Sequence, residues 1–440
     1  CPPVRPARPR SATATTPVRG SSVAYLAGVA LAGVVVAGAL TACGSTQDDS
    51  DDSTPAATAS GTAPAATGSA SSAPTTDTPD TAASCAVPED LAQLAGSALA
   101  VGVTGFDDAA AAVDAGVRHI FVGSGTDLSI LDGQGDPERS ISALKDRARA
   151  ANETNGVNGD NGDGAELAVS VDEEGGQVQR LAGVIGEVPS ARQLAETMEP
   201  GQVIDLFAEH GRKMAELGIT MDFAPVVDLA GGEQISDNAI GDRSFSDDPA
   251  VVTDYAAAAA QGLQQAGVTP VIKHFPGHGH ATGDSHHGTV TTPPIDQMDA
   301  DLQPFADLLN GEGDTDGPGI AVMVGHMQTP GLDAPDAPGA STPASLNPAV
   351  YEMLRTGPVG GPGFDGVIFT DDLTGMAAIT DLHSGPDAVV AAVRAGSDAP
   401  LTSTAANVQA TVDGIVAAVE EGSLDRERLE ETSARQCALN

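Results

Sequence analysis

The chain reads Val268-Thr269-Pro270-Val271-Ile272-Lys273-His274-Phe275-Pro276-Gly277-His278-Gly279, and Asp284-Ser285-His286-His287 follows shortly after. A mostly apolar run, typical of a buried strand, therefore ends in a lysine and a histidine. Charged side chains are seldom placed at the end of such a strand without a functional reason. The glycines that follow allow tight turns and a close approach of the backbone to a ligand. This stretch predicts a strand end that carries chemistry.

Similar short apolar runs recur along the chain. The strand candidates are Ala98–Val103, His119–Gly123, Leu167–Val171, Thr220–Pro225, Thr269–Lys273, Ile320–Val324, Gly366–Thr370 and Ser397–Leu401. Amphipathic stretches lie between them, such as Val203–Leu217, Ala250–Ala266 and Ala405–Glu421. Eight strands alternating with helices predict an α/β fold, a single (β/α)8 TIM barrel. A doubly wound open sheet is the alternative, but the Gly-rich nucleotide turn that usually follows its first strand is missing from this sequence.

Polar motifs fall where the predicted strands end. They are Asp172-Glu173-Glu174 after the third strand, Asp222 and Asp228 at or after the fourth, Lys273-His274 at the fifth, His326 after the sixth and Asp371-Asp372 after the seventh. Barrel enzymes build their active sites at the C-terminal ends of the strands. A structural protein has no reason to place charge there repeatedly, so the pattern predicts an enzyme.

The first fifth of the chain is not expected to belong to the barrel. Four arginines precede an apolar run from Val23 to Leu40, and Leu40-Thr41-Ala42-Cys43 resembles a bacterial lipobox. Residues 1–42 are therefore interpreted as a signal peptide, and Cys43 as the lipidated first residue of an exported protein anchored to the outer face of the cell membrane. An uncleaved membrane helix is the alternative. Residues 43–84, rich in Ser, Thr, Ala, Asp and Pro, predict a disordered tether, and residues 85–440 predict the barrel.

Charge and cysteines constrain the function further. The net charge is −41, and no basic patch indicates nucleic-acid binding. The acidic surface is interpreted as a solvated one that keeps the protein soluble. Cys85 and Cys437 bracket the predicted domain, and in an exported protein such a pair indicates a disulfide. Two free thiols are the alternative.

Four motifs, taken together, carry a family resemblance. They are Lys273–Gly279 with Asp284–His286, Asp-Glu-Glu-Gly-Gly-Gln-Val-Gln-Arg at 172–180, Gly-Asp-Arg-Ser-Phe at 241–245 and Phe-Thr-Asp-Asp-Leu at 369–373. In this order they resemble glycoside hydrolase family 3, in its β-N-acetylglucosaminidase branch, over about residues 95–401. The resemblance implies a retaining exo-enzyme that releases terminal β-linked N-acetylglucosamine from peptidoglycan fragments. It implies a monomer without cofactor or metal.

Three residues are the catalytic candidates. Asp371 is the first ionisable residue after the apolar run that ends at Thr370, and both its position and the resemblance make it the nucleophile. A helix N-cap is the alternative role. Asp284 and His286 are two residues apart, so the carboxylate can orient and polarise the imidazole. The resemblance makes them an acid/base dyad, with His286 as the proton donor; a solvated loop without a role is the alternative.

The resemblance also implies sugar-binding residues. The positions that hold the hydroxyls of the terminal sugar are Asp172, Arg180, Arg243, Lys273 and His274. Asp228 is interpreted instead as part of a structural ion pair. The sequence departs from the family at Gln177, where Arg is common, and at His280, where Asp is common.

Other functions fit parts of the pattern. The dense histidines suggest a zinc site, but they lack helical His-x-x-x-His spacing and have no neighbouring Cys, which speaks against a metal. A phosphorylase is an alternative, because a neutral imidazole repels phosphate less than a carboxylate does. A β-glycosidase of another specificity is a second alternative. A non-catalytic sugar-binding lipoprotein is the third, and the intact nucleophile and dyad argue against it.

Overall fold

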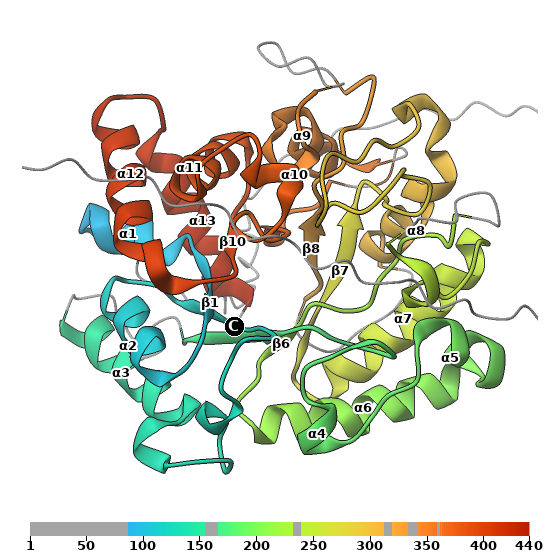
Figure 1. The fold of residues 1–440 in the computed structure, drawn as a ribbon, viewed down its shortest axis with the longest axis horizontal. Helices are drawn as coiled ribbons and strands as arrows, with labels where there is room; N and C mark the ends of the chain where they lie inside the picture. Colours follow the sequence, from blue (N-terminus) through green and yellow to red (C-terminus); the bar gives the residue numbers. More distant parts are fainter. Residues whose placement is uncertain are drawn as a thin grey trace, which may run out of the picture. The chain divides into compact units, whose positions relative to one another are not determined.

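Eight parallel strands form the centre of the fold (Figure 1). The strands are β1 (Ala100–Val103), β2 (His119–Val122), β3 (Ala168–Val171), β6 (Met221–Asp222), β7 (Thr269–Phe275), β8 (Ala321–Val324), β9 (Ile368–Thr370) and β10 (Leu401–Thr402). Their order in the sheet is β10-β1-β2-β3-β6-β7-β8-β9. Phe369 and Ala399 form one further parallel bridge, so β9 meets the segment that leads into β10. The sheet is a nearly closed barrel, and the predicted α/β fold with eight parallel strands is confirmed.

The computed structural model describes residues 87–154, 166–231, 239–311, 319–332, 341–358, 361 and 363–439. The predicted signal peptide, Cys43, the tether and Cys85 lie outside these residues. Within them, no helix is both long enough and apolar enough to cross a membrane.

Most strands are shorter than predicted, and two differ most from their expected bounds. The strand expected at Thr220–Pro225 is Met221–Asp222, and the one expected at Ser397–Leu401 is Leu401–Thr402. Pro225 has no N–H to donate to a neighbouring strand, and the pairing with β7 resumes only as an isolated bridge at Val226. Before β10, Asp398 uses its side chain to bind the N–H of Ile368, which replaces regular strand pairing there.

Helices follow most strands and lie outside them (Figure 1). They are α1 (Leu91–Ser97), α2 (Phe106–Asp114), α3 (Ile141–Thr154), α4 (Ala182–Ile185), α5 (Ala191–Thr197), α6 (Pro200–Glu216), α7 (Pro249–Gln265), α8 (Asp299–Leu309), α9 (Pro348–Thr356), α10 (Ala377–Thr380), α11 (Gly385–Ala395), α12 (Val408–Glu420) and α13 (Arg426–Leu439). The helices predicted at Val203–Leu217 and Ala250–Ala266 are α6 and α7. The third, α12, begins three residues later than predicted, because Ala405–Asn407 forms a 3-10 turn capped by the Thr404 side chain.

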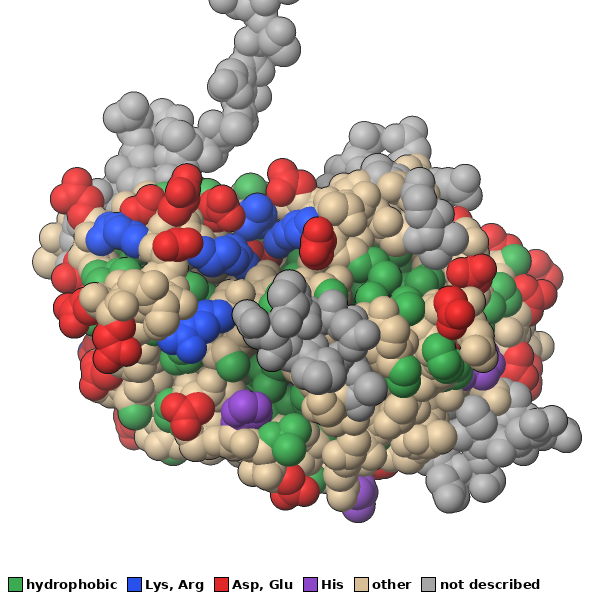
Figure 2. All heavy atoms as spheres, turned by 90° about the horizontal axis from the view of Figure 1, so that it is seen from above, with side chains coloured by type: hydrophobic (Ala, Val, Ile, Leu, Met, Phe, Trp, Pro, Cys, Tyr) green, Lys and Arg blue, Asp and Glu red, His purple; other side chains and the backbone are tan. Residues whose placement is uncertain are grey.

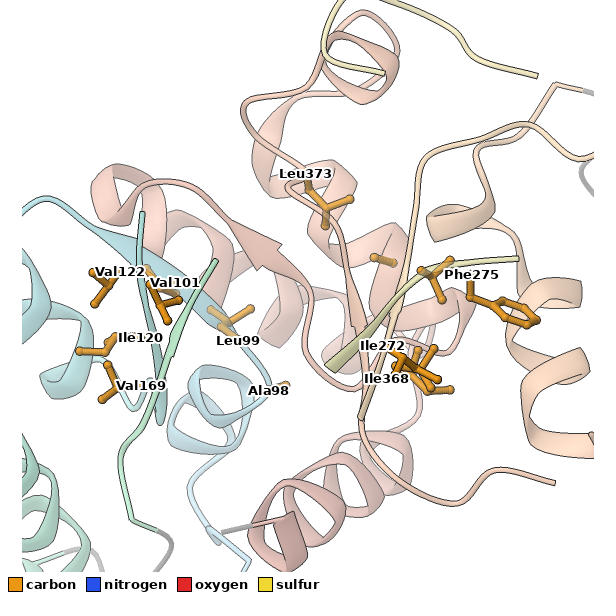
Figure 3. Packing of buried hydrophobic residues seen from close by; sticks show 14 of the residues in the cluster. Ala98, Leu99, Val101, Ile120, Val122, Val169, Ile272, Phe275, Ile368 and Leu373 are labelled. Atoms are coloured by element: carbon orange, nitrogen blue, oxygen red, sulfur yellow. The ribbon is translucent and has the colours of Figure 1, made fainter. Parts of the chain in front are cut away.

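Side chains alternate between the inside and the outside of the barrel, as a two-residue strand period requires. The inner cluster is Ala100, Phe121, Met221, Phe223, Val271, Ala321, Met323, Val367, Phe369, Ala399 and Leu401. The alternate residues, among them Val101, Ile120, Val169, Ile272 and Ile368, belong to the cluster that also contains the apolar faces of the helices (Figure 3). This period places Asp371 on the inner side after Phe369, and Lys273 on the inner side after Val271. The same alternation that builds the core therefore brings charge to the mouth of the barrel.

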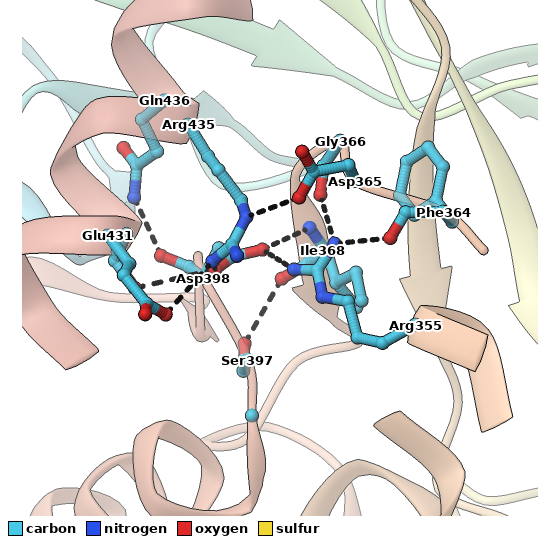
Figure 4. Close-up of polar contacts among 12 residues, drawn as sticks. Arg355, Phe364, Asp365, Gly366, Ile368, Ser397, Asp398, Glu431, Arg435 and Gln436 are labelled. Carbon is cyan, nitrogen blue, oxygen red and sulfur yellow. Dashed lines mark hydrogen bonds and ion pairs between the residues drawn. The ribbon is translucent and has the colours of Figure 1, made fainter. Parts of the chain in front are cut away.

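The opposite end of the barrel is tied together by Asp398, which is completely buried (Figure 4). Its carboxylate accepts hydrogen bonds from Arg355 at 2.5 Å and Arg428 at 2.9 Å, and Arg435 lies 3.3 Å away. Arg355 belongs to α9, and the other two arginines to α13. We call these four residues the Asp398 hub.

The last turn of α13 also reaches the barrel. Leu439 packs against the inner cluster. Cys437 is disulfide-bonded. Its predicted partner, Cys85, is outside the described residues, so the pairing stays a prediction.

Candidate active site

The predicted site residues converge on one cavity at the C-terminal ends of the strands. Its volume is about 150 Å³, and it is lined by Asp172, Glu174, Val178, Arg180, Ala239, Ile240, Arg243, Lys273, His274, His278, Ser285, His286, Asp371 and Met376. Of the eight predicted catalytic and sugar-binding residues, Asp284 alone is missing from this lining, and it contacts His286. Pockets for drug-sized ligands hold about 300–1,000 Å³, so this one suits a single sugar ring.

Asp371 directly follows the C-terminal end of β9, and its side chain lines the cavity. Its N–H donates to the carbonyl oxygen of Val324 at 2.9 Å, and its Oδ1 accepts from the N–H of Asp372 at 2.8 Å. Burial acts to raise the pKa of Asp371, but the imidazoles of His326 and His274 and the nearby N–H outweigh it and bring the pKa to about 2. Asp371 is therefore ionised at neutral pH, which a carboxylate nucleophile requires.

The neighbouring Asp372 is not part of the cavity lining, as the two-residue strand period requires for the residue next to Asp371. Its Oδ1 accepts from the N–H groups of Thr374 and Ser403, at 2.8 and 2.9 Å. These bonds connect the segment after β9 to the segment after β10. Asp372 therefore supports the backbone around Asp371.

His326 holds the same backbone from β8. Its Nε2 lies 2.9 Å from the carbonyl oxygen of Asp372, and its Nδ1 lies 2.8 Å from Oγ of Ser345. A carbonyl can only accept, so Nε2 carries a proton, and Nδ1 can accept from the hydroxyl of Ser345. Burial lowers the pKa of His326, although the charge of Asp371 acts in the opposite direction. The sequence placed His326 at a strand end without indicating this supporting role.

A chain of ion pairs forms one wall of the cavity. Lys273, only 2% exposed, places Nζ 2.8 Å from Oδ1 of Asp172 and 2.6 Å from Oε1 of Glu174. Arg243 binds Glu174 with two parallel hydrogen bonds of 2.7 and 2.8 Å. Burial acts to raise the pKa of Glu174, but Lys273 and Arg243 outweigh it and hold the pKa far below its usual range. Arg180 lies 3.6 Å from Asp172. We call Asp172, Glu174, Arg243 and Lys273 the mouth network.

Asp228 organises the turn that follows β7. It is fully buried, and its Oδ2 lies 2.6 Å from Nδ1 of His274. Its Oδ1 accepts the backbone N–H of His278 at 2.6 Å. Asp228 therefore holds both the His274 side chain and the backbone of the turn, and does not line the cavity. With Nδ1 bound to Asp228, the Nε2 of His274 lies 3.4 Å from Arg243 at the cavity wall.

The predicted dyad lies at the rim of the cavity. Nδ1 of His286 is 2.8 Å from Oδ1 of Asp284, which leaves Nε2 of His286 without a described protein partner. Burial acts to raise the pKa of Asp284, but the hydrogen bonds from His286 outweigh it. The side chain of His286 is 62% exposed, as access to a leaving group requires. His287, whose side chain is 82% exposed, lies 3.3 Å from Oδ2 of Asp284 and is not part of the cavity lining. The geometry favours His286 as the ring that faces the sugar.

The dyad loop contacts the segment that carries Asp371. The carbonyl oxygen of Ser285 accepts the N–H of Ala378 at 3.1 Å. Thr282 and Thr291 form an antiparallel bridge at the base of the loop. The dyad and Asp371 are therefore held in one assembly, although 85 residues separate His286 from Asp371 in the sequence.

Residues 111–439 match the Glycosyl hydrolase family 3 N terminal domain. The chain belongs to glycoside hydrolase family 3. It is 45% identical, over 80% of its length and 82% of the relative's, to Beta-hexosaminidase LpqI of Mycobacterium tuberculosis. It is 35% identical to a Beta-hexosaminidase of Xylella fastidiosa over 53% of its length and 66% of that protein. The predicted enzyme class, a glycoside hydrolase of the β-hexosaminidase type, is confirmed.

Solved structures of family 3 proteins agree with this assignment. A glycosyl hydrolase of Mycobacterium smegmatis is 47% identical, with a TM-score of 0.69 over 80% of this chain and 98% of that one. A β-N-acetylglucosaminidase from Paenibacillus is 29% identical, with a TM-score of 0.66 over 80% of this chain and 62% of that one. The barrel described above is therefore shared with family 3 proteins.

Gln177 and His280, interpreted from the sequence as departures from the family pattern, make local contacts and do not line the cavity. Gln177 donates to Oδ1 of Asp242 at 3.0 Å, and His280 lies 2.8 Å from Asp301. Among the residues that the structure describes, no group of three or more His, Cys, Asp or Glu side chains is placed to hold a metal ion.

Sequence reasoning missed part of the site. Glu174 was visible in the 172–180 motif, but its bonds to two cations were not. The antiparallel hairpin of β4 (Glu173–Gly175) and β5 (Val178–Gln179), which carries Glu174, was not predicted either. Its tight turn uses Gly176 at a φ of 58°, where any Cβ would also lie 2.6 Å from Ser190. Two adjacent glycines in the motif are the signal that could have indicated this turn.

Proposed function

We propose that this family 3 enzyme is a retaining exo-β-N-acetylglucosaminidase whose natural substrates are peptidoglycan fragments. The observation that carries the proposal is an ionised Asp371 in a cavity for one sugar, with the His286–Asp284 pair at the rim. The small cavity supports removal of a terminal residue. The names of the relatives, hexosaminidases and a β-N-acetylglucosaminidase, support N-acetylglucosamine as the sugar.

The first step forms a covalent intermediate. The carboxylate of Asp371 attacks the anomeric carbon while the bond from that carbon to the leaving oxygen breaks. His286 donates its Nε2 proton to the leaving oxygen, and Asp284 holds the ring through Nδ1. The products are a glycosyl ester on Asp371 and the free leaving group.

The second step reverses these roles. His286, now neutral, accepts a proton from a water molecule, whose oxygen attacks the anomeric carbon. The ester bond breaks and Asp371 regains its negative charge. Two inversions give net retention of the anomeric configuration.

The measurement that tests this function is the configuration of the first product. The enzyme is expected to hydrolyse an aryl β-N-acetylglucosaminide, and NMR of the early product should show the β-anomer. The α-anomer appearing first would exclude the double displacement. A muropeptide with a terminal N-acetylglucosamine should be shortened by one sugar. Release of a disaccharide would exclude the exo mode.

The role of His286 has its own test. His286→Ala should slow substrates with poor leaving groups by about 10²–10⁴-fold and activated aryl substrates far less, because only poor leaving groups need a proton. Equal loss on both kinds of substrate would show that His286 is not the acid.

For the cellular location we propose an exported, monomeric protein anchored through a lipid on Cys43. The lipobox-like segment and the polar tether support this proposal. Cys43→Ser should move the protein from the membrane fraction to the soluble fraction. Unchanged membrane association would exclude the anchor. A non-reducing peptide map tests the predicted Cys85–Cys437 bond.

A further inference from the structure

His278 lies in the cavity but has no part in the proposed mechanism. Its side chain is among those that line the cavity, and the residue is only 4% exposed. Three polar side chains around it already have partners: Lys273 and Arg243 are bound to carboxylates, and His274 is bound to Asp228. The ring of His278 differs from all of them.

The imidazole of His278 makes no hydrogen bond to any residue that the structure describes. Nδ1 is fully buried and has no hydrogen-bond partner among the described residues. Buried polar atoms are nearly always hydrogen-bonded, and leaving one unpaired costs free energy. An unpaired ring at the wall of a sugar-sized cavity therefore points to a partner that the bound ligand supplies.

The backbone that carries the ring is fixed by its neighbours. The backbone N–H of His278 donates to Asp228, and glycines stand on both sides. Gly277 has a φ of 128°, and a Cβ on Gly279 would lie 2.2 Å from the carbonyl oxygen of Leu229. A ring carried on a backbone that is held in place before binding loses less entropy when it meets a ligand.

The chemistry of the ring restricts the ligand group. Burial lowers the pKa of His278, and His274 and Arg243 lower it further, although Asp228 acts in the opposite direction. A neutral imidazole has one N–H donor and one acceptor nitrogen. Such a ring matches a hydroxyl or an amide, which can both donate and accept, better than it matches an ion.

We propose that His278 is a specificity-determining contact, whose imidazole hydrogen-bonds one neutral polar group of the sugar, either a ring hydroxyl or the acetamido group. The proposal rests on the proposed function, because it deepens the recognition of the same sugar. It adds a residue to the ion-paired groups that bind the other hydroxyls.

The test couples a variant to a series of substrates. The probes are an aryl β-N-acetylglucosaminide, its 3-, 4- and 6-deoxy derivatives, and the aryl β-glucoside, which has a hydroxyl in place of the acetamido group. His278→Phe keeps the ring shape and removes both nitrogens. On the parent substrate its kcat/KM should fall about 5- to 100-fold, the range for one lost hydrogen bond in a buried site. On the one analogue that lacks the partner group, wild type and variant should be equal.

An equal loss on every substrate would show that His278 shapes the protein without touching the sugar, and would overturn the proposal. His278→Gln, which keeps a donor and an acceptor, should recover part of the activity and guards against a Phe variant that fails to fold. His383→Phe, an exposed histidine outside the cavity, is the matched control.

The two proposals can fail separately. A wild-type enzyme that hydrolyses none of the probes contradicts the proposed function. Calorimetric titration with free N-acetylglucosamine and its deoxy analogues still decides the role of His278 in that case. If His278→Phe weakened the binding of all these ligands equally, or of none, the proposed contact between His278 and the sugar would be wrong.

Discussion

Both ends of the barrel contain buried carboxylates, and the cations that neutralise them are arranged differently at each end. The mouth network shares two carboxylates, Asp172 and Glu174, between Lys273 and Arg243, and all four side chains line the cavity. The Asp398 hub surrounds one completely buried carboxylate with three guanidinium groups and the N–H of Ile368. Buried ion pairs therefore do not by themselves mark a binding site. What differs is where the paired groups lie: the mouth network is at the C-terminal ends of the strands, and the Asp398 hub is at their N-terminal ends.

The larger cavity is at the hub end. It holds about 510 Å³, and Arg355, Arg428 and Arg435 line it. Their charge is balanced by Asp398, and for Arg435 also by Asp365 and Glu431 (Figure 4). On the face seen in Figure 2, basic side chains likewise gather beside acidic ones. Position relative to the strand ends, and not cavity size or the presence of buried ion pairs, separates the proposed catalytic end from the structural end.

Removing the nucleophile should have the largest effect and should be confined to activity. Asp371→Ala is expected to lower kcat by about four orders of magnitude or more, because the covalent step is lost. The measurement is turnover of an aryl N-acetylglucosaminide, with thermal unfolding as the control for folding. Activity close to wild type would remove Asp371 from the mechanism.

Removing the hub carboxylate should lower stability and leave activity nearly unchanged, the opposite of the effect expected for Asp371→Ala. Asp398→Ala leaves three guanidinium groups without their shared partner and should cost about 3–5 kcal/mol of unfolding free energy. The activity of the protein that remains folded should be nearly unchanged. Chemical denaturation measures the first quantity. Asp365→Ala is the matched control: its side chain is 95% exposed, and the change should cost less than about 1 kcal/mol. If Asp398→Ala lowered the unfolding free energy as little as Asp365→Ala does, the structural role of the Asp398 hub would be wrong.

Removing Glu174, the carboxylate that Lys273 and Arg243 share, should lower both activity and stability moderately. Glu174→Gln frees Lys273 and Arg243 from their common partner, so both cations can shift away from the sugar. We expect kcat/KM to fall about 10- to 100-fold, with a rise in KM. Steady-state kinetics measure this effect. A variant that loses stability with unchanged kinetics would show that the mouth network is structural, like the hub.

Acid should weaken the mouth network gradually. The folded-state pKa of Glu174 is far below its ordinary value of 4.5, so the group stabilises the fold above pH 4.5 and loses this contribution as pH falls further. Denaturation at several pH values should show a slope of at most about 1.4 kcal/mol per pH unit from this group. The slope should be smaller in Glu174→Gln. An identical slope in the variant would mean that other carboxyl groups cause the acid sensitivity.

The sequence predicted the barrel because eight short apolar runs alternate with amphipathic helical stretches. The two-residue strand period accounts for Asp371 on the inner side and Asp372 on the outer side. It could not place His274 and His278, because the pairing of β7 with β8 shifts register between Lys273 and Phe275, which interrupts the two-residue period.

The contacts of the Asp398 hub could not be predicted from the sequence, for a different reason. Arg428 and Arg435 follow Asp398 by 30 and 37 residues, on a helix whose packing decides the contact. Glu174 was hidden similarly, since its partner Arg243 is 69 residues away. Local patterns predict strands and their ends, but they do not specify which distant charges meet.

The burial of the mouth network has a consequence for ionic strength. Dissolved ions screen charges that water reaches, whereas Lys273 and Glu174 have side chains only 2% and 3% exposed. The whole chain carries a net charge of −41, and repulsion among its exposed acidic groups is strongest in dilute buffer. Added salt should therefore weaken the repulsion between exposed charges and leave the buried pairs of the mouth network intact.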